Sequence, residues 1–117
     1  MHEMSIALSL VEQLQRLAEQ HHATSISELE VQCGVMRQVV PEALELAFTA
    51  AAMETIAAGA TLKIIEEPLV VRCRQCGTEF AAEIDDYACS GCKLADVEIL
   101  AGRDIVLKSV TCETEDR

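Results

Sequence analysis

The stretch CRQCGTEFAAEIDDYACSGC, residues 73–92, contains two C-x-x-C turns separated by twelve residues, and this spacing decides how the chain can fold. Two sulfur atoms separated by two residues can lie on one tight turn and bind one ion, and a second such turn completes a tetrahedron. Gly77 and Gly91 let the backbone fold so that its N–H groups face the thiolates. The pattern predicts a zinc site formed by four residues: Cys73, Cys76, Cys89 and Cys92.

Two disulfides, an iron centre or a thioredoxin-like redox pair are the alternatives for these cysteines. A redox motif needs one C-x-x-C that follows a strand and opens a helix, and two copies flanking GTEFAAEIDDYA do not match that arrangement. Four thiolates would close the coordination sphere of zinc, so the predicted ion is structural. Because a module of about 35 residues lacks a core of its own, the metal would supply much of its folding free energy.

The charge of this cysteine module, residues 68–102, argues against nucleic-acid binding. The module contains three basic and six acidic side chains, a net charge of −3 before a zinc tetrathiolate adds to it. Phosphate would be repelled by such a surface. The whole chain of 117 residues has a formal net charge of −11, which suits cations or basic partner surfaces and disfavours anionic membranes.

Outside the module, the apolar pattern predicts two helices. Residues 3–21 have apolar side chains at spacings of three and four, with Glu, Gln and Arg on the opposite face. Pro41 can open a second helix at its first position, and Gly59 can close it. No Ser, Thr or Asp is present to cap the start of this second helix, so its boundary near Val40 is weakly defined.

Three segments read as strands of one sheet. Residues 28–35 alternate between apolar and polar side chains, and TLKIIEEP (61–68) is stopped by its proline. RDIVLKSVTC (103–112) follows the cysteine module. Two strands joined through one helix are expected to run parallel. The predicted fold class is α/β, with two helices on a three-stranded mixed sheet and an inserted zinc-ribbon module.

The domain organisation follows from this order of elements. We expect an α/β domain from residues 1–67 and 103–117 and a zinc ribbon from residues 68–102. The sequence shows neither a signal peptide nor an apolar run of transmembrane length, so we expect a cytoplasmic protein without membrane insertion. Six cysteines in a reducing compartment indicate metal or redox chemistry, and a secreted, disulfide-bonded protein is the alternative.

His2 and Glu3 place an imidazole and a carboxylate beside the amino end of the chain at Met1. The α-amine, the deprotonated amide of His2 and its imidazole can close two fused chelate rings around one ion. The amide of Glu3 can be a fourth planar nitrogen, a set that suits Ni(II) or Cu(II). A histidine in second position is also compatible with no metal role, and the residues alone leave both readings open.

The motifs taken together resemble one known family. MHEMSIA at the start, ELEVQCG followed by VVPEALELAFTAA, GATLKIIEEP and the two C-x-x-C turns are similar to the HypA/HybF family of hydrogenase nickel-incorporation proteins. The resemblance covers essentially the whole chain. Two features depart from the family pattern. Ser90 and Lys93 stand where Pro and Gly or His are often found, and CGVMRQV (33–39) replaces a more usual Gly-Leu-Ser-type stretch.

The resemblance implies a nickel metallochaperone and not an enzyme. It implies that Met1, His2 and Glu3 bind transported Ni(II), and that structural Zn(II) is held by Cys73, Cys76, Cys89 and Cys92. The implied partners are the GTPase HypB and the [NiFe]-hydrogenase large subunit precursor. Some family members also serve urease, which adds urease maturation factors to the partner classes.

Four further residues carry metal-binding groups. His21 and His22 lie at the end of the first predicted helix, as auxiliary metal ligands or as solvated groups that favour the helix dipole. Cys33 and Cys112 lie on predicted strands and are read as buried small apolar residues, with redox pairing as the alternative. The alternative functions are a zinc-ribbon adaptor without nickel binding and a thiol-disulfide oxidoreductase.

Overall fold

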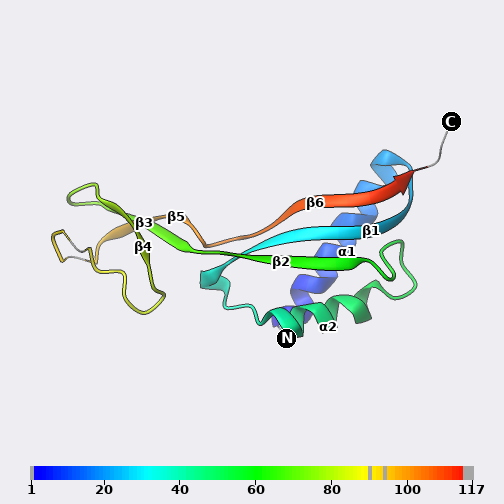
Figure 1. The fold of residues 1–117 in the computed structure, drawn as a ribbon, viewed down its shortest axis with the longest axis horizontal. Coiled ribbons are helices and arrows are strands. Elements are labelled where there is room, and N and C mark those ends of the chain that lie inside the picture. Colours follow the sequence, from blue (N-terminus) through cyan, green and yellow to red (C-terminus); the bar gives the residue numbers. More distant parts are fainter. Residues whose placement is uncertain (1, 90, 94, 115–117) are drawn as a thin grey trace. The chain divides into compact units, whose positions relative to one another are not determined.

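The computed structural model describes residues 2–89, 91–93 and 95–114 (Figure 1). The chain divides into two compact units, each containing a three-stranded sheet. Unit 1 consists of Met1–Val31, Val39–Ile64 and Leu107–Arg117, and unit 2 consists of Gln32–Gln38 and Ile65–Val106. Among the described residues, no helix combines the length and apolar character that a membrane crossing requires.

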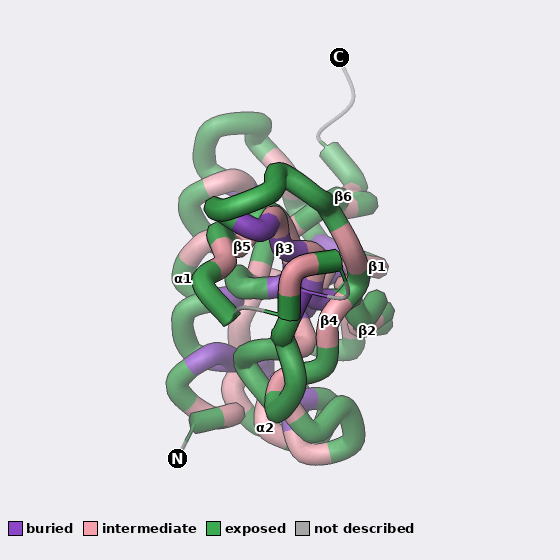
Figure 2. The backbone as a smooth tube through the Cα atoms, turned by 90° about the vertical axis from the view of Figure 1, so that its left-hand side faces the viewer, coloured by how far each residue is buried: buried purple, intermediate pink, exposed green. Residues whose placement is uncertain are grey.

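Two helices and one mixed sheet form the first of these units. Strands β2 (Thr61–Glu67), β1 (Ala23–Gly34) and β6 (Ile105–Thr114) lie side by side in that order. β1 and β2 run in the same direction and β6 runs in the opposite one, while α1 (His2–His21) and α2 (Pro41–Ala52) lie on one side of the sheet (Figures 1 and 2). The predicted arrangement of two helices on a three-stranded mixed sheet is confirmed.

The core of unit 1 is aliphatic except for one ring. Phe48 of α2 is 1% exposed, and Figure 2 shows the buried positions in purple along the helices and the sheet. Leu8 is part of the predicted apolar stripe of the first helix, but its side chain is exposed. The other buried residues of unit 1 are Ile6, Ala7, Leu10, Val11, Leu14, Ala18, Ile26, Leu29, Val31, Leu44, Ala52 and Ala57.

Two predicted boundaries are wrong. The second helix ends at Ala52 and not near Gly59, because Glu54 takes a left-handed φ of 63° and the Thr55 hydroxyl donates to the Ala52 carbonyl at 2.6 Å. The same hydroxyl accepts the N–H of Ala57, which holds the chain in a turn. The first predicted strand starts earlier, at Ala23, and ends at Gly34, because the next three residues form the 3₁₀ turn η1 (Val35–Arg37).

Unit 2 contains a second sheet whose strands the sequence pattern does not predict. β3 (Leu69–Cys73) is the central strand and pairs antiparallel with β4 (Glu79–Ala82) and with β5 (Val97–Ala101). On the solvent face of β3, the Arg72 guanidinium bridges two facing carboxylates. Its nitrogens lie 2.8 Å from Glu79 on one neighbour and 3.5 Å from Glu98 on the other, a cross-strand pairing that helps to fix the register.

Two glycines of unit 2, Gly34 and Gly102, allow backbone segments to pass very close to one another. Gly102 has a φ of +93°, and a Cβ there would lie 2.5 Å from the Pro68 carbonyl oxygen and 2.6 Å from the Cα of Leu69. Gly34 packs directly against the carbonyl of Gly102, and its N–H donates to the Asp104 carbonyl at 2.8 Å. Only a residue without a side chain fits at this close backbone crossing.

Replacement of Gly102 by alanine is expected to destabilise unit 2 by roughly 2–4 kcal/mol, because the methyl group meets backbone that cannot move aside. Gly59→Ala is the matched control: its φ is also positive, at +78°, but nothing lies within 4 Å of the added Cβ. Gly59→Ala should lower the free energy of unfolding by only about 1 kcal/mol, because an alanine is strained in the left-handed conformation but meets no neighbouring atom. Urea unfolding of zinc-loaded protein measures both costs, through the NMR signals of β3 for Gly102→Ala in unit 2 and through those of α2 for Gly59→Ala in unit 1. Equal losses in the two variants would contradict the steric argument.

Candidate metal sites

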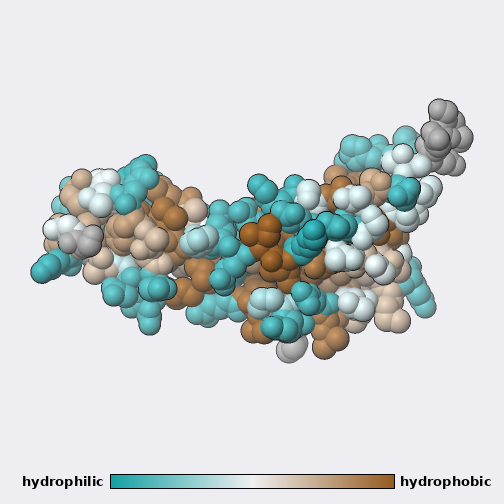
Figure 3. Space-filling view, in the orientation of Figure 1, coloured by the Kyte–Doolittle hydropathy of each residue, from teal (hydrophilic) through white to brown (hydrophobic). Residues whose placement is uncertain are grey.

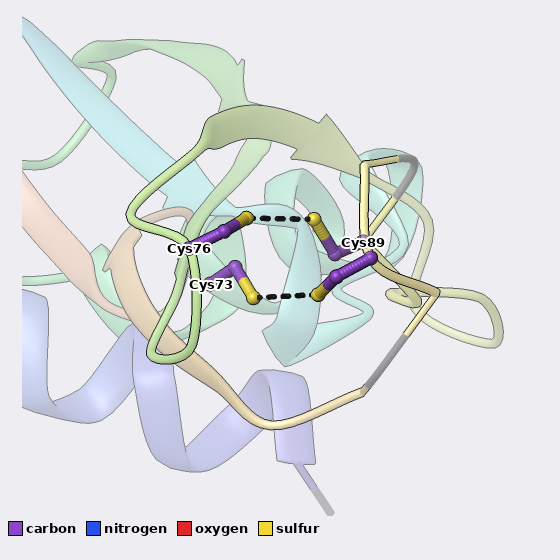
Figure 4. Close-up of side chains that lie close together, drawn as sticks. Cys73, Cys76 and Cys89 are labelled. Carbon is purple, nitrogen blue, oxygen red and sulfur yellow. Dashed lines mark hydrogen bonds between the residues drawn. The ribbon is translucent and has the colours of Figure 1, made fainter.

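The four predicted cysteines meet in unit 2, where all four Sγ atoms lie within 4.8 Å of one another. Figure 4 shows two sulfur pairs facing each other across the site. The Sγ atoms of Cys73 and Cys92 are 3.3 Å apart, and those of Cys76 and Cys89 are 3.5 Å apart. A zinc tetrathiolate with bonds of about 2.3 Å has sulfur–sulfur distances of roughly 3.8 Å. The donor set and its spacing therefore fit a tetrahedral zinc ion.

The backbone around the first turn is held for this arrangement. Cys73 ends β3, its N–H donates to the Thr78 carbonyl at 2.9 Å, and the N–H of Gly77 donates back to the Cys73 carbonyl at 2.8 Å. In the second turn, the N–H of Gly91 donates to the Cys89 sulfur at 3.3 Å. Lys93, at one of the positions that depart from the family pattern, has a left-handed φ of 64°, a conformation that glycine adopts at lower cost.

Hydrogen bonds to sulfur favour the thiolate form that a metal needs. The Thr78 hydroxyl and backbone N–H lower the pKa of Cys76 to about 6, and the backbone N–H of Cys76 lowers the pKa of Cys73. Cys73 and Cys89 are buried. Thiolates in this cluster would repel one another without a cation between them, so the electrostatics also favour a divalent metal.

The predicted nickel residues lie at the start of α1 in unit 1, and Met1 lies outside the described residues. His2 is exposed, and its Nδ1 is 3.7 Å from the Glu3 carboxylate. The first four N–H groups of an α-helix have no intrahelical acceptor. The amides of His2 and Glu3 are among them, so their N–H groups donate no helical hydrogen bond that a metal would have to replace.

The Glu3 side chain makes a contact that the sequence analysis does not predict. Its carboxylate accepts the backbone N–H of Val40 at 3.1 Å, and Val40 is the residue that precedes α2. The Val40 side chain makes no capping hydrogen bond to α2, so the Glu3 carboxylate is the side chain that anchors this helix start. The Val40 N–H is the main cause of a pKa of Glu3 below its ordinary value.

We expect Glu3→Gln to lower the stability of metal-free unit 1 in a pH-dependent way. The folded pKa of Glu3 is lowered, so its contribution is complete above the ordinary glutamate pKa, about 4.3, and is lost as pH falls through the folded value. Urea midpoints of wild type and Glu3→Gln should differ at pH 7 and converge in acid. Glu19→Gln, an exposed change on the same helix, is the control; a difference that persists in acid would contradict the assignment to ionised Glu3.

The remaining candidates are not members of the cysteine cluster. His21 and His22 are exposed at the end of α1. Cys33 of β1 is buried as predicted, and burial raises the pKa of its thiol. Cys112 of β6 is half-buried and lines a cavity of about 340 Å³ between the end of α1 and β6. None of these four belongs to a group of three or more metal-binding side chains in the described part of the chain.

Comparison with known proteins identifies the family. Residues 1–112 match the family model described as "HypA: Hydrogenase/urease nickel incorporation, metallochaperone, hypA". The chain belongs to the HypA family. The match begins at the first residue of the chain and extends through the cysteine cluster and almost all of β6.

Individual HypA proteins show the same relationship over nearly their whole length. The hydrogenase maturation factor HypA of Pelodictyon phaeoclathratiforme is 38% identical over 115 residues, which cover 98% of each chain. The protein of that name from Chlorobium phaeobacteroides is 36% identical over 113 residues, 97% of this chain and 100% of its own. The solution structure of the Ni metallochaperone HypA from Helicobacter pylori is 25% identical, with a TM-score of 0.73, and the alignment covers 98% of this chain and 100% of that one.

Membership in the HypA family fixes the general role. The chain is a nickel-incorporation metallochaperone of hydrogenase maturation, and such maturation factors are not enzymes. This role implies interaction with the hydrogenase maturation machinery. The four-cysteine cluster is compatible with structural zinc, as the predicted combination of a resident zinc ion and a transported nickel ion requires.

Proposed function

We propose that the protein captures Ni(II) at its amino terminus and delivers it to the [NiFe]-hydrogenase large subunit precursor, with the GTPase HypB as partner, in the cytoplasm. Nickel binding is assigned to Met1, His2 and Glu3 in the domain formed by residues 1–67 and 103–117. The observation that carries this proposal is the adjacency of an exposed His2 imidazole and two first-turn amides in a HypA-family chain.

The chemistry of this donor set suits a carrier. Deprotonation of two amides leaves a planar set of nitrogens without net charge on the complex, and the first turn of α1 must open to form it. Opening costs folding free energy at a helix end, where fraying is cheapest. Nickel affinity is therefore expected to be moderate, which allows transfer by exchange of ligands at the acceptor.

Zinc has a different task in the proposal. We assign it to Cys73, Cys76, Cys89 and Cys92 of the ribbon, residues 68–102, where four sulfur ligands leave no position open for a substrate or for exchange. The ion would stabilise the ribbon and take no part in transport. Thiol-disulfide exchange by these cysteines is disfavoured, because both C-x-x-C turns would be occupied as ligands.

Transfer of radioactive nickel tests the proposal directly. Protein with its native amino terminus is loaded with ⁶³Ni and mixed with hydrogenase precursor, HypB and GTP, and a protein with an acetylated terminus is the control. We expect labelled precursor from the native protein and none above background from the acetylated one. Equal labelling by both would place nickel elsewhere, and labelling by neither would reduce the chain to a zinc-ribbon adaptor.

A further inference from the structure

Helix α2 is apolar on two opposite faces, and only one of them is covered. Leu44, Phe48 and Ala52 point into the core of unit 1. On the other side, Leu46 and Ala50 of α2 recur at helical spacing with Met53, the residue that directly follows the helix; Leu46 is 74% and Met53 is 66% exposed. A helix that is apolar on both sides is normally buried on both sides. We call Leu46, Ala50 and Met53 the outer face of α2.

The outer face of α2 forms a continuous apolar stripe. Single exposed apolar residues are ordinary, but residues at positions i, i+4 and i+7 form one continuous stripe. In the space-filling view, brown apolar atoms appear at the lower edge of the molecule, where α2 lies in Figure 1 (Figure 3). No requirement of the core explains these side chains, since the opposite face of the helix already supplies the buried contacts.

The charged side chains along α2 and the segments that flank it, residues 38–62, are all of one sign. Residues 38–62 include three carboxylates, Glu42, Glu45 and Glu54, and no Lys, Arg or His. The three glutamates are exposed. In a homodimer formed through this face, the glutamates of one copy would face the same glutamates of the other. Each copy also carries a net charge of −11, so the two would repel each other. Charge complementarity therefore favours an apolar groove with a rim of Lys and Arg on a different protein.

We propose that α2 docks by its outer face into such a basic-rimmed apolar groove on a protein partner of nickel delivery, an inference that rests on the proposed function. The mode is that of an amphipathic helix in a groove, with Leu46 and Met53 as anchors one above the other. The partner would then sit on the helix whose first residue follows Val40, the backbone anchor of Glu3. The docking helix and the proposed nickel donors of α1 would thus be joined within unit 1 by the Glu3–Val40 hydrogen bond.

The test measures binding of the full chain to purified HypB and, separately, to the hydrogenase large subunit precursor. The double variant Leu46→Glu/Met53→Glu adds charge at two solvent positions and leaves the core unchanged. We expect it to weaken at least one complex by about 30-fold or more, as loss of interface anchors does. Leu8→Glu, which changes a 56% exposed leucine on α1, should alter affinity by less than about 2-fold.

A second variant tests the charge argument. Glu42→Lys/Glu45→Lys should weaken the same complex at low salt, and the difference from wild type should shrink as salt is added. Wild-type affinity in Leu46→Glu/Met53→Glu for both proteins would overturn the proposal, as would failure of the wild type to bind either. A wild-type dimer in sedimentation that this double variant dissociates would assign the outer face to self-association and overturn it too.

Nickel titration of the same variants separates docking from capture. Leu46→Glu/Met53→Glu should bind nickel as tightly as wild type, because its changes lie outside the amino-terminal donors. Loss of partner binding with retained nickel binding supports a docking face. If nickel does not bind at the amino terminus in any variant, the proposed function fails while the result for the outer face can still be read from the binding measurements.

Discussion

Cys89→Ser is expected to abolish zinc retention and to unfold the three strands of unit 2. Cys89 is 1% exposed, and its sulfur lies 3.5 Å from that of Cys76. A serine hydroxyl is a poor zinc ligand, and three remaining thiolates would be left crowded around an incomplete site. Structural zinc contributes roughly 10–16 kcal/mol to the folding of small zinc modules. This exceeds what a unit of about fifty residues can draw from its core.

The measurement is zinc per chain by metal analysis, with NMR spectra of both units. We expect about one zinc in wild type and close to none in Cys89→Ser, with the signals of β3, β4 and β5 collapsed and those of α1 and α2 retained. Cys112→Ser is the matched control, since Cys112 belongs to unit 1 and is not one of the four clustered cysteines. A Cys89→Ser protein that purifies with wild-type zinc, or whose β3 signals persist without metal, would contradict a structural zinc in this site.

The parts of the molecule that could be predicted are those encoded by short sequence spacings. The cluster of four cysteines follows from two C-x-x-C turns, and α1 follows from apolar residues at intervals of three and four. The strands β2 and β6 follow from alternation and from the proline that stops the first of them. In each case the deciding interactions join residues that are close in sequence, so the pattern alone records them.

The parts that could not be predicted depend on contacts between distant segments. Glu3 accepts a hydrogen bond from Val40, which is 37 residues away in the sequence, and no pattern of neighbouring residues at either position predicts this bond. The close approach of Gly34 to Gly102 likewise appears only when β1 and the chain after β5 are brought together. The end of α2 was misplaced for a local reason: the Thr55 hydroxyl competes for backbone groups, and its signal is weaker than that of a glycine.

The second large effect concerns the amino terminus. His2→Ala is expected to weaken Ni(II) binding by more than about 100-fold, because even the loss of a group that only supports a metal ligand costs about 10–100-fold. In the proposed site the imidazole closes one of two fused chelate rings, and without it the α-amine and amides would form a weaker, more solvated set. His2 is exposed at the helix end, and its removal leaves the core untouched.

Isothermal titration and visible spectroscopy on protein with a native terminus measure this effect. Wild type should show the diamagnetic, square-planar spectrum of four nitrogen donors. It should release about two protons per nickel from the amides and, below the α-ammonium pKa of about 8, roughly one more from the amino terminus, so that its affinity rises with pH. His2→Ala should lose both signatures, whereas His21→Ala/His22→Ala, which removes the two exposed imidazoles at the other end of α1, should keep them. The opposite pattern would move the nickel site to the end of the helix. In that case Glu3 would have no role in nickel binding and would act only as an anchor of α2, because its carboxylate accepts the Val40 N–H without a metal.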